Sequence, residues 1–294
     1  MSEDAIQRYY EIREEYWRAV ESSWTDLNEL KKRTRALAAH RVKFSSSITE
    51  LLRLGHEGHV EACFILGDAY VAGNGVSRDR ARAILWFKKA AEAGHVRAMV
   101  RLANALTHPE SPATAKEGVL WLKKAAAVGD SAAMVFLGFA YREGKGVPQD
   151  YEEAARWFTR AYEAGDLHSM AHIGQLHAWW TKSPAQALPW LRRAADAGFT
   201  DSYWALATLC ADVKSPFFSP AEAVHWYRAI ANSPVSGAAR ALVYLARLTR
   251  DGIGTEQNLS LAQTYLETAL TLAAPKEVRL EAEKLLTDIK ASLL

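Results

Sequence analysis

The feature that most constrains this chain is an internal repeat of about 35 residues. An aromatic residue, an Ala-rich stretch and a closing Gly recur together, and the clearest copies are residues 86–94, 121–129, 157–165 and 190–198. Weaker copies begin at Trp226 and Tyr265. A repeat of this length predicts a solenoid, in which each unit buries its apolar face against its neighbours.

A second motif, in phase with the first, indicates that each repeat holds two helices. Leu66-Gly67 with Tyr70 matches Leu137-Gly138 with Tyr141, and each copy lies about 20 residues before its aromatic anchor. Small residues let neighbouring helices approach closely, and the aromatic pair fills the groove between them. The closing Gly favours a left-handed helix end. Asp79 and Asp150 follow the Gly-x-Gly turns between the helices and are predicted to cap the second helices.

These motifs resemble the Sel1-like repeat, a relative of the tetratricopeptide repeat. The match is close over residues 62–94 and 133–165, limited to the second helix at 98–129 and 170–198, and degenerate near 203–232 and 241–273. The resemblance implies a right-handed all-α solenoid of about six two-helix repeats that mediates protein–protein contact, often as an adaptor in bacterial signalling or secretion. The cysteine pairs of the secreted branch of the family are absent, since only Cys63 and Cys210 are present.

The chain is predicted to have three parts. Residues 1–50 hold an amphipathic helix and a basic segment, residues 51–274 form the solenoid, and residues 275–294 form a C-terminal capping helix that begins at Pro275. The apolar face of this last helix is formed by Val278, Ala282, Leu285, Leu286 and Ile289.

The N-terminal part has two interpretations. The apolar stripe of a helix over residues 4–30 consists of Tyr9, Ile12, Tyr16, Val20, Trp24 and Leu27. It either caps the solenoid or binds a partner, including a second copy of the chain. Six Lys and Arg residues and no acid occupy positions 31–43. This run is either a solvated face or a contact for an acidic partner or phosphates.

Three turns contain Pro in place of Gly-x-Gly, at residues 107–112, 181–184 and 214–220. Proline stops the first helix and begins the second. The third turn carries Phe217-Phe218, which either contact a partner or pack back onto the solenoid. In Trp179-Trp180, one ring is predicted to be buried and the other exposed.

Composition and motifs argue against other classes of protein. The chain is 49% hydrophobic and 24% charged, as expected of a folded chain, and no apolar run is long enough to span a bilayer. The acidic N-terminus and the two thiols predict a cytoplasmic location. His168 and His172 have zinc-binding spacing but lack the general-base Glu, and His56-Glu57-Gly58-His59 is also incomplete. We therefore expect no enzymatic activity, no metal and no cofactor.

By analogy with the tetratricopeptide arrangement, the first helices of the repeats line the inner surface, where a protein or peptide would bind. Aligning each repeat on its Leu anchor predicts the positions Phe64, Asp68, Arg97, Asn104, His108, Phe139, Arg142, Gln175, Trp179, Trp204, Thr208, Arg247 and Arg250. Aromatics and arginines are enriched at binding hot spots. The predicted function is a non-enzymatic adaptor, in a more specific form an immunity protein or effector chaperone of a secretion system. The alternatives are a nucleic-acid-associated regulator using residues 31–43, and a self-associating structural solenoid.

Overall fold

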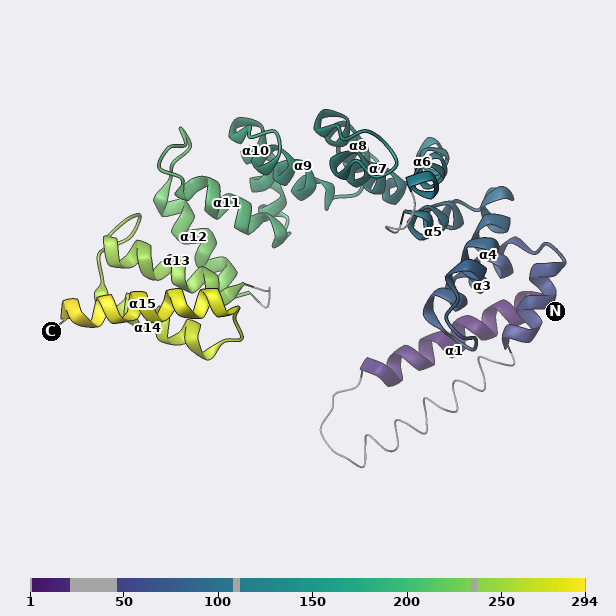
Figure 1. The fold of residues 1–294 in the computed structure, drawn as a ribbon, viewed down its shortest axis with the longest axis horizontal. Helices are drawn as coiled ribbons and strands as arrows, with labels where there is room; N and C mark the ends of the chain where they lie inside the picture. The colour runs from purple at the N-terminus through teal and green to yellow at the C-terminus, as the bar shows by residue number, and fades with distance from the viewer. Residues whose placement is uncertain (1, 22–46, 108–111, 234–236, 294) are drawn as a thin grey trace, which may run out of the picture. The chain divides into compact units, whose positions relative to one another are not determined.

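A computed structural model of the chain describes residues 2–21, 47–107, 112–233 and 237–293. Every regular element within those ranges is an α-helix, as the repeat predicted (Figure 1). The chain divides into two compact units, residues 1–150 and residues 151–294. The basic run 31–43 and His108 lie outside the described residues.

Unit 1 consists of helices that pack in sequence order. They are α1 (Ser2–Glu21), a short helix at 47–56, α3 (Val60–Ala72), α4 (Arg80–Glu92), α5 (Val96–Leu106), α6 (Pro112–Ala127) and α7 (Ser131–Glu143). Helix α3 packs on α4, α4 on α5, α5 on α6 and α6 on α7. The predicted two-helix repeat is therefore present, with α3, α5 and α7 as its first helices and α4 and α6 as its second. We call these the A helices and the B helices.

Unit 2 continues the same alternation. Its helices are α8 (Tyr151–Glu163), α9 (Ser169–Trp179), α10 (Pro184–Asp196), α11 (Asp201–Ala211), α12 (Pro220–Ala231), α13 (Ala238–Asp251), α14 (Leu259–Thr271) and α15 (Lys276–Leu293). The A helices are α9, α11 and α13. Helices α13, α14 and α15 lie side by side at the C-terminal end (Figure 1). Helix α15 buries four of the five residues predicted for its apolar face, and Leu286 is partly buried.

The helix ends follow the predicted chemistry. The closing glycines of the four clear copies all have positive φ, from 85° at Gly198 to 97° at Gly165. Asp79 caps α4 by accepting a hydrogen bond from the Arg82 N–H at 3.0 Å. Asp130 and Asn258 cap α7 and α14 in the same way. Side-chain caps therefore satisfy N–H groups that would otherwise lack a partner at these helix starts.

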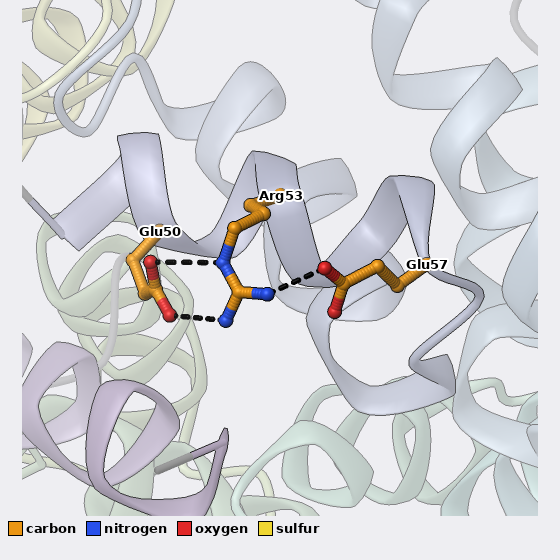
Figure 2. Close-up of polar contacts among 3 residues, drawn as sticks. All are labelled: Glu50, Arg53 and Glu57. Atoms are coloured by element: carbon orange, nitrogen blue, oxygen red, sulfur yellow. Dashed lines mark hydrogen bonds and ion pairs between the residues drawn. The ribbon is translucent and has the colours of Figure 1, made fainter.

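A B-type helix precedes the first repeat, and sequence reasoning missed it. Helix 47–56 buries Leu51 and Leu54 and is followed by Gly58, whose φ is 88°. On its surface Arg53 bonds to Glu50 at 2.7 Å and also contacts Glu57 (Figure 2). These side chains are about half exposed, and exposed ion pairs contribute little to stability. Leu51 and Leu54 therefore hold this helix in place.

Both cysteine thiols are buried. Cys63 is 2% exposed and Cys210 is 0% exposed, and neither forms a disulfide. Burial raises the pKa of both thiols, that of Cys210 to about 12, which lowers the thiolate fraction at neutral pH. We expect Ellman's reagent at pH 8 to label the native chain at least about tenfold more slowly than the chain in guanidinium chloride. Rapid labelling of two thiols in the native chain would contradict this burial.

Candidate partner-binding surface

Three cavities lie along the A helices of unit 1. One of about 490 Å³ lies between the first repeat and α5, and one of about 240 Å³ lies between α5 and the start of α7. A third, of about 300 Å³, lies beside the C-terminal halves of α5 and α7. Asn104 lines all three, and it is exposed. The predicted position Asn104 is therefore the point where the three cavities meet.

Two further residues border two cavities each, and neither was predicted. Arg101 lies one helical turn before Asn104 and lines the first two cavities. Phe136 lines the second and third, and 38% of its surface is exposed. Its ring lies one turn before the predicted Phe139, which also lines the third cavity. Residues three apart share a helix face, so the same alignment contained the signal for both.

The charges around these cavities are mixed. Arg101 lies 3.5 Å from Asp68, whose pKa is raised because burial disfavours its charge. Arg142 lies 4.7 Å over the Phe139 ring and 2.7 Å from Glu143. Burial disfavours the Glu143 carboxylate, but hydrogen bonds from Lys145 and Arg142 outweigh it and lower the pKa of Glu143. The predicted residues Asp68, Phe139 and Arg142 thus border one continuous series of cavities.

Phe64 was predicted to face a partner, and the structure contradicts this. Its side chain is 1% exposed. The ring stacks on His95 at 4.6 Å and contacts Phe87 at 6.1 Å, while the Arg97 guanidinium lies 5.0 Å over it. Side chains from α4 and from the start of α5 therefore cover a position that faces outward in the isolated helix. Arg97 itself is exposed and lines the second cavity.

Helix α1 contacts the first repeat (Figure 1). The Tyr10 hydroxyl donates to Glu61 Oε1 at 2.7 Å, and Glu61 Oε2 lies 3.0 Å from His95 Nε2. The Ala98 N–H donates to His95 Nδ1 at 3.0 Å, so Nε2–H is the donor to Glu61. Burial disfavours the Glu61 carboxylate, but these bonds outweigh it and lower the pKa of Glu61. The Glu61 carboxylate on α3 therefore links α1, through Tyr10, to the start of α5, through His95.

The predicted stripe of α1 is described only in part. Tyr9 is 1% exposed, and its burial raises the pKa of the phenol to about 12. Ile12 is half-buried. The side chains of Tyr16, Val20, Trp24 and Leu27 lie outside the described residues.

In unit 2, Trp179 and Trp180 are both exposed, at 42% and 36%. The prediction that one of them is buried was wrong. The buried stripe of α9 runs through Ile173, Leu176 and His177, and the helix ends at Trp179, just before the stripe would reach position 180. The rings are therefore carried at the end of the helix and outside its core face.

Trp204 belongs to an aromatic cluster with Tyr227 and Tyr244. The two tyrosine rings stack at 5.0 Å, and Trp204 meets them edge-on at 5.9 and 6.3 Å. Trp204 is half-buried, whereas Tyr244 is 38% exposed. Sequence reasoning missed Tyr244, although it lies one turn before the predicted Arg247, which approaches the Tyr244 ring at 6.0 Å. Trp204 has a packing role in addition to any binding role.

The remaining predicted positions in unit 2 have local partners. Gln175 donates to the Asp201 carbonyl at 2.8 Å, and Thr208 donates to the Trp204 carbonyl at 2.6 Å. Arg247 pairs with Glu281, and Arg250 lies 2.6 Å from Asp251. In the Pro-containing turn, Phe217 and Phe218 are 37% and 39% exposed, so neither packs fully onto the solenoid.

His168 and His172, which were weighed as metal ligands, pack against aromatic rings. His168 packs on Phe199 at 4.3 Å and His172 on Phe158 at 5.3 Å. Across the described ranges, no group of three or more His, Cys, Asp or Glu side chains is placed to hold a metal ion. Within those same ranges, no helix has the length and apolar character to cross a bilayer.

Comparison with known proteins identifies the repeat. An uncharacterized protein of Neisseria meningitidis serogroup B is 31% identical over 140 residues, which is 46% of this chain and 28% of that protein. A protective antigen of uropathogenic Escherichia coli with an SLR fold superposes with a TM-score of 0.64 at 24% identity, over 85% of this chain and 53% of that one. A Sel1 repeat protein from Oxalobacter formigenes gives a TM-score of 0.58 at 27% identity, over 79% and 94%.

The chain thus spans about a quarter of the Neisseria relative and about half of the E. coli antigen. The sequence model of the Sel1 repeat matches six segments, residues 60–95, 96–130, 131–166, 181–199, 215–233 and 239–272. Together these segments make up more than half of the chain, and the chain therefore belongs to the Sel1 repeat family.

Proposed function

We propose that this chain is a protein-binding scaffold that holds partner segments on its A helices. The observation that carries the proposal is the exposure of large aromatic side chains on A helices in both units: Phe136 on α7, Trp179 on α9 and Tyr244 on α13. Exposed aromatics beside arginines are typical of binding hot spots. Sel1 repeat proteins generally act as non-catalytic interaction scaffolds, which supports this assignment.

We propose two more specific forms of this scaffold function. An immunity protein or an effector chaperone would both use such a surface. Nucleic-acid binding through residues 31–43 and self-association through α1 are the competing assignments. Each predicts a different companion molecule, so one purification separates them.

The test is affinity purification of the tagged chain from its native host, washed at low and at high salt, with mass spectrometry of what remains bound. We expect one stoichiometric protein that survives high salt. Nucleic acid that washes off with salt, with no protein partner, would overturn the proposal, since phosphate contacts weaken steeply with salt. Recovery of untagged copies of this chain alone would assign the solenoid to self-association.

The exposed aromatics give a second prediction. Phe136→Ala combined with Trp179→Ala is expected to weaken binding of the purified partner by about tenfold or more, because truncated hot spots remove that much affinity. Isothermal titration calorimetry measures the affinity. The matched control is Leu85→Ala with Leu120→Ala, two side chains that are 63% and 62% exposed on B helices.

Circular dichroism should show both double variants to be fully helical. Equal affinity of the two double variants would place the binding surface elsewhere. Trp204→Ala is less suitable for this test, because its ring packs on Tyr227 and its loss destabilises the aromatic cluster.

A further inference from the structure

We propose that the A-helix face of unit 1 binds an extended peptide segment carrying acidic and apolar side chains. This inference rests on the proposed function and adds the chemistry of the partner. The surface in question is the row of cavities along α3, α5 and α7.

Helix α5 presents a polar stripe to these cavities. Arg97, Arg101 and Asn104 follow each other at spacings of four and three residues, so they form one stripe along the helix. All three line the cavity between α5 and α7, on the opposite side from Phe136. A single helix thus presents two guanidinium groups and one carboxamide to the same hollow.

The two guanidinium groups of this stripe retain hydrogen-bonding capacity. In the described part of the chain, Arg97 forms no ion pair or hydrogen bond, and its guanidinium is held against the Phe64 ring at 5.0 Å. Arg101 lies 3.5 Å from Asp68, which is longer than the roughly 2.7–2.9 Å of a charge-assisted hydrogen bond. Five N–H donors per guanidinium leave ample capacity for an incoming carboxylate.

Positive side chains outnumber negative ones in the lining of the cavity between α5 and α7. Asp130 is the acidic residue that lines the cavity between α5 and α7, and it already accepts the Ala133 N–H at 2.7 Å as the cap of α7. This cavity is therefore lined by two cations and one engaged carboxylate, and a second carboxyl, Asp68, lies 3.5 Å from Arg101 in the adjoining cavity. Positive charge of this kind favours acidic ligands and raises their rate of association.

The polar and apolar groups that line these cavities favour a peptide over a nucleic acid. The Asn104 carboxamide offers N–H donors and a carbonyl acceptor on one side chain, the pair that an extended peptide backbone requires. In the described part of the chain its side chain forms no hydrogen bond. Phe136 and Val100 add apolar surface to the same cavity. Asp68, Asp130 and Glu143 line the row as well, and they repel a ligand charged at every position, such as a phosphate backbone, more than a peptide whose acidic side chains are spaced apart. A peptide with alternating acidic and apolar side chains meets all of these groups.

The experiment is selection of random twelve-residue peptides on phage against the immobilised full chain at low salt. The most enriched peptide is then synthesised with a fluorescent label, and its affinity is measured by fluorescence polarisation. We expect enrichment of Asp or Glu together with aromatic or aliphatic residues. For the double variant Arg97→Gln with Arg101→Gln, we expect an affinity loss of about tenfold.

The matched control also removes two positive charges, but from B helices, in the double variant Lys116→Gln with Arg228→Gln. It should bind the peptide as tightly as the unaltered chain does. Asn104→Ala should weaken binding of the same peptide without changing its salt dependence. The inference is overturned by peptides without acidic enrichment, by no enrichment, by equal binding of the two charge variants, or by displacement with a short single-stranded oligonucleotide. The proposed function is judged separately by the affinity purification, so either can fail while the other stands.

Discussion

Gly146→Ala is expected to lower the free energy of unfolding by about 3 kcal/mol or more, whereas Gly129→Ala should cost only about 1 kcal/mol. Both residues have positive φ, 74° at Gly146 and 91° at Gly129, so both substitutions carry the strain of a left-handed Ala. They differ in what a Cβ would meet. At Gly146 it would lie 2.4 Å from the Ala115 carbonyl oxygen, while at Gly129 nothing lies within 4 Å.

The difference between the two variants isolates the close approach from the backbone strain. Because the oxygen that the new methyl group meets belongs to the backbone of α6, a side-chain rotation cannot relieve the contact. Urea denaturation followed by circular dichroism measures both values, and the analysis must allow the two units to unfold separately. Equal costs for the two substitutions would mean that Gly146 is needed only for its φ.

At the Gly-x-Gly turns, the sequence predicts the role of the first Gly but not that of the second. The first Gly of each Gly-x-Gly turn was predictable, because a helix end in the left-handed conformation favours Gly. The second Gly is required because of a close contact with the backbone of another helix, which only the folded structure shows. Gly254 repeats the role of Gly146 in unit 2, since its Cβ would lie 2.3 Å from the Pro220 carbonyl carbon at the start of α12. Contact with a helix about 30 residues away leaves no local mark on the sequence.

The sequence predicted which helices form the candidate surface better than it predicted which of their residues lie on it. Alignment on the Leu anchor predicted Asn104 and Phe139, which line the cavities, but missed Phe136 and Tyr244. Those two lie one turn earlier on the same face, so a wider helical window would have included them. The prediction that Phe64 faces a partner was wrong for a different reason. Phe64 shares a face with Asp68, but His95 at the start of α5 covers it.

Gly67→Ala is expected to destabilise the chain by about 3 kcal/mol, although Ala is the better helix former by about 1 kcal/mol at an ordinary helical position. Gly67 lies inside α3, and a Cβ there would meet two ring carbons of Phe87, each at 2.4 Å. The ring has no room to retreat, because Phe87 is 1% exposed. Steric overlap should therefore outweigh helix propensity, and urea denaturation reads the result directly.

The recurrence of a small residue after each Leu anchor has the same cause, and a double-mutant cycle tests it. Phe87→Leu alone should cost about 1–2 kcal/mol, since it leaves part of the ring volume empty. A smaller side chain at 87 makes room for the methyl group at 67. The double variant should therefore lose at least about 1 kcal/mol less than the sum of the two single losses.

Gly129→Ala combined with Phe87→Leu serves as the control and should be additive, because a Cβ at 129 meets no atom within 4 Å. Additivity at positions 67 and 87 as well would mean that the two residues do not share the space between α3 and α4. In the fourth repeat, a Cβ at Gly174 would meet Leu191 at 2.6 Å, so this pair predicts the same sign of coupling. In these two repeats the small residue on the A helix and the large apolar residue on the B helix are then one structural unit, which sets how closely the two helices approach each other.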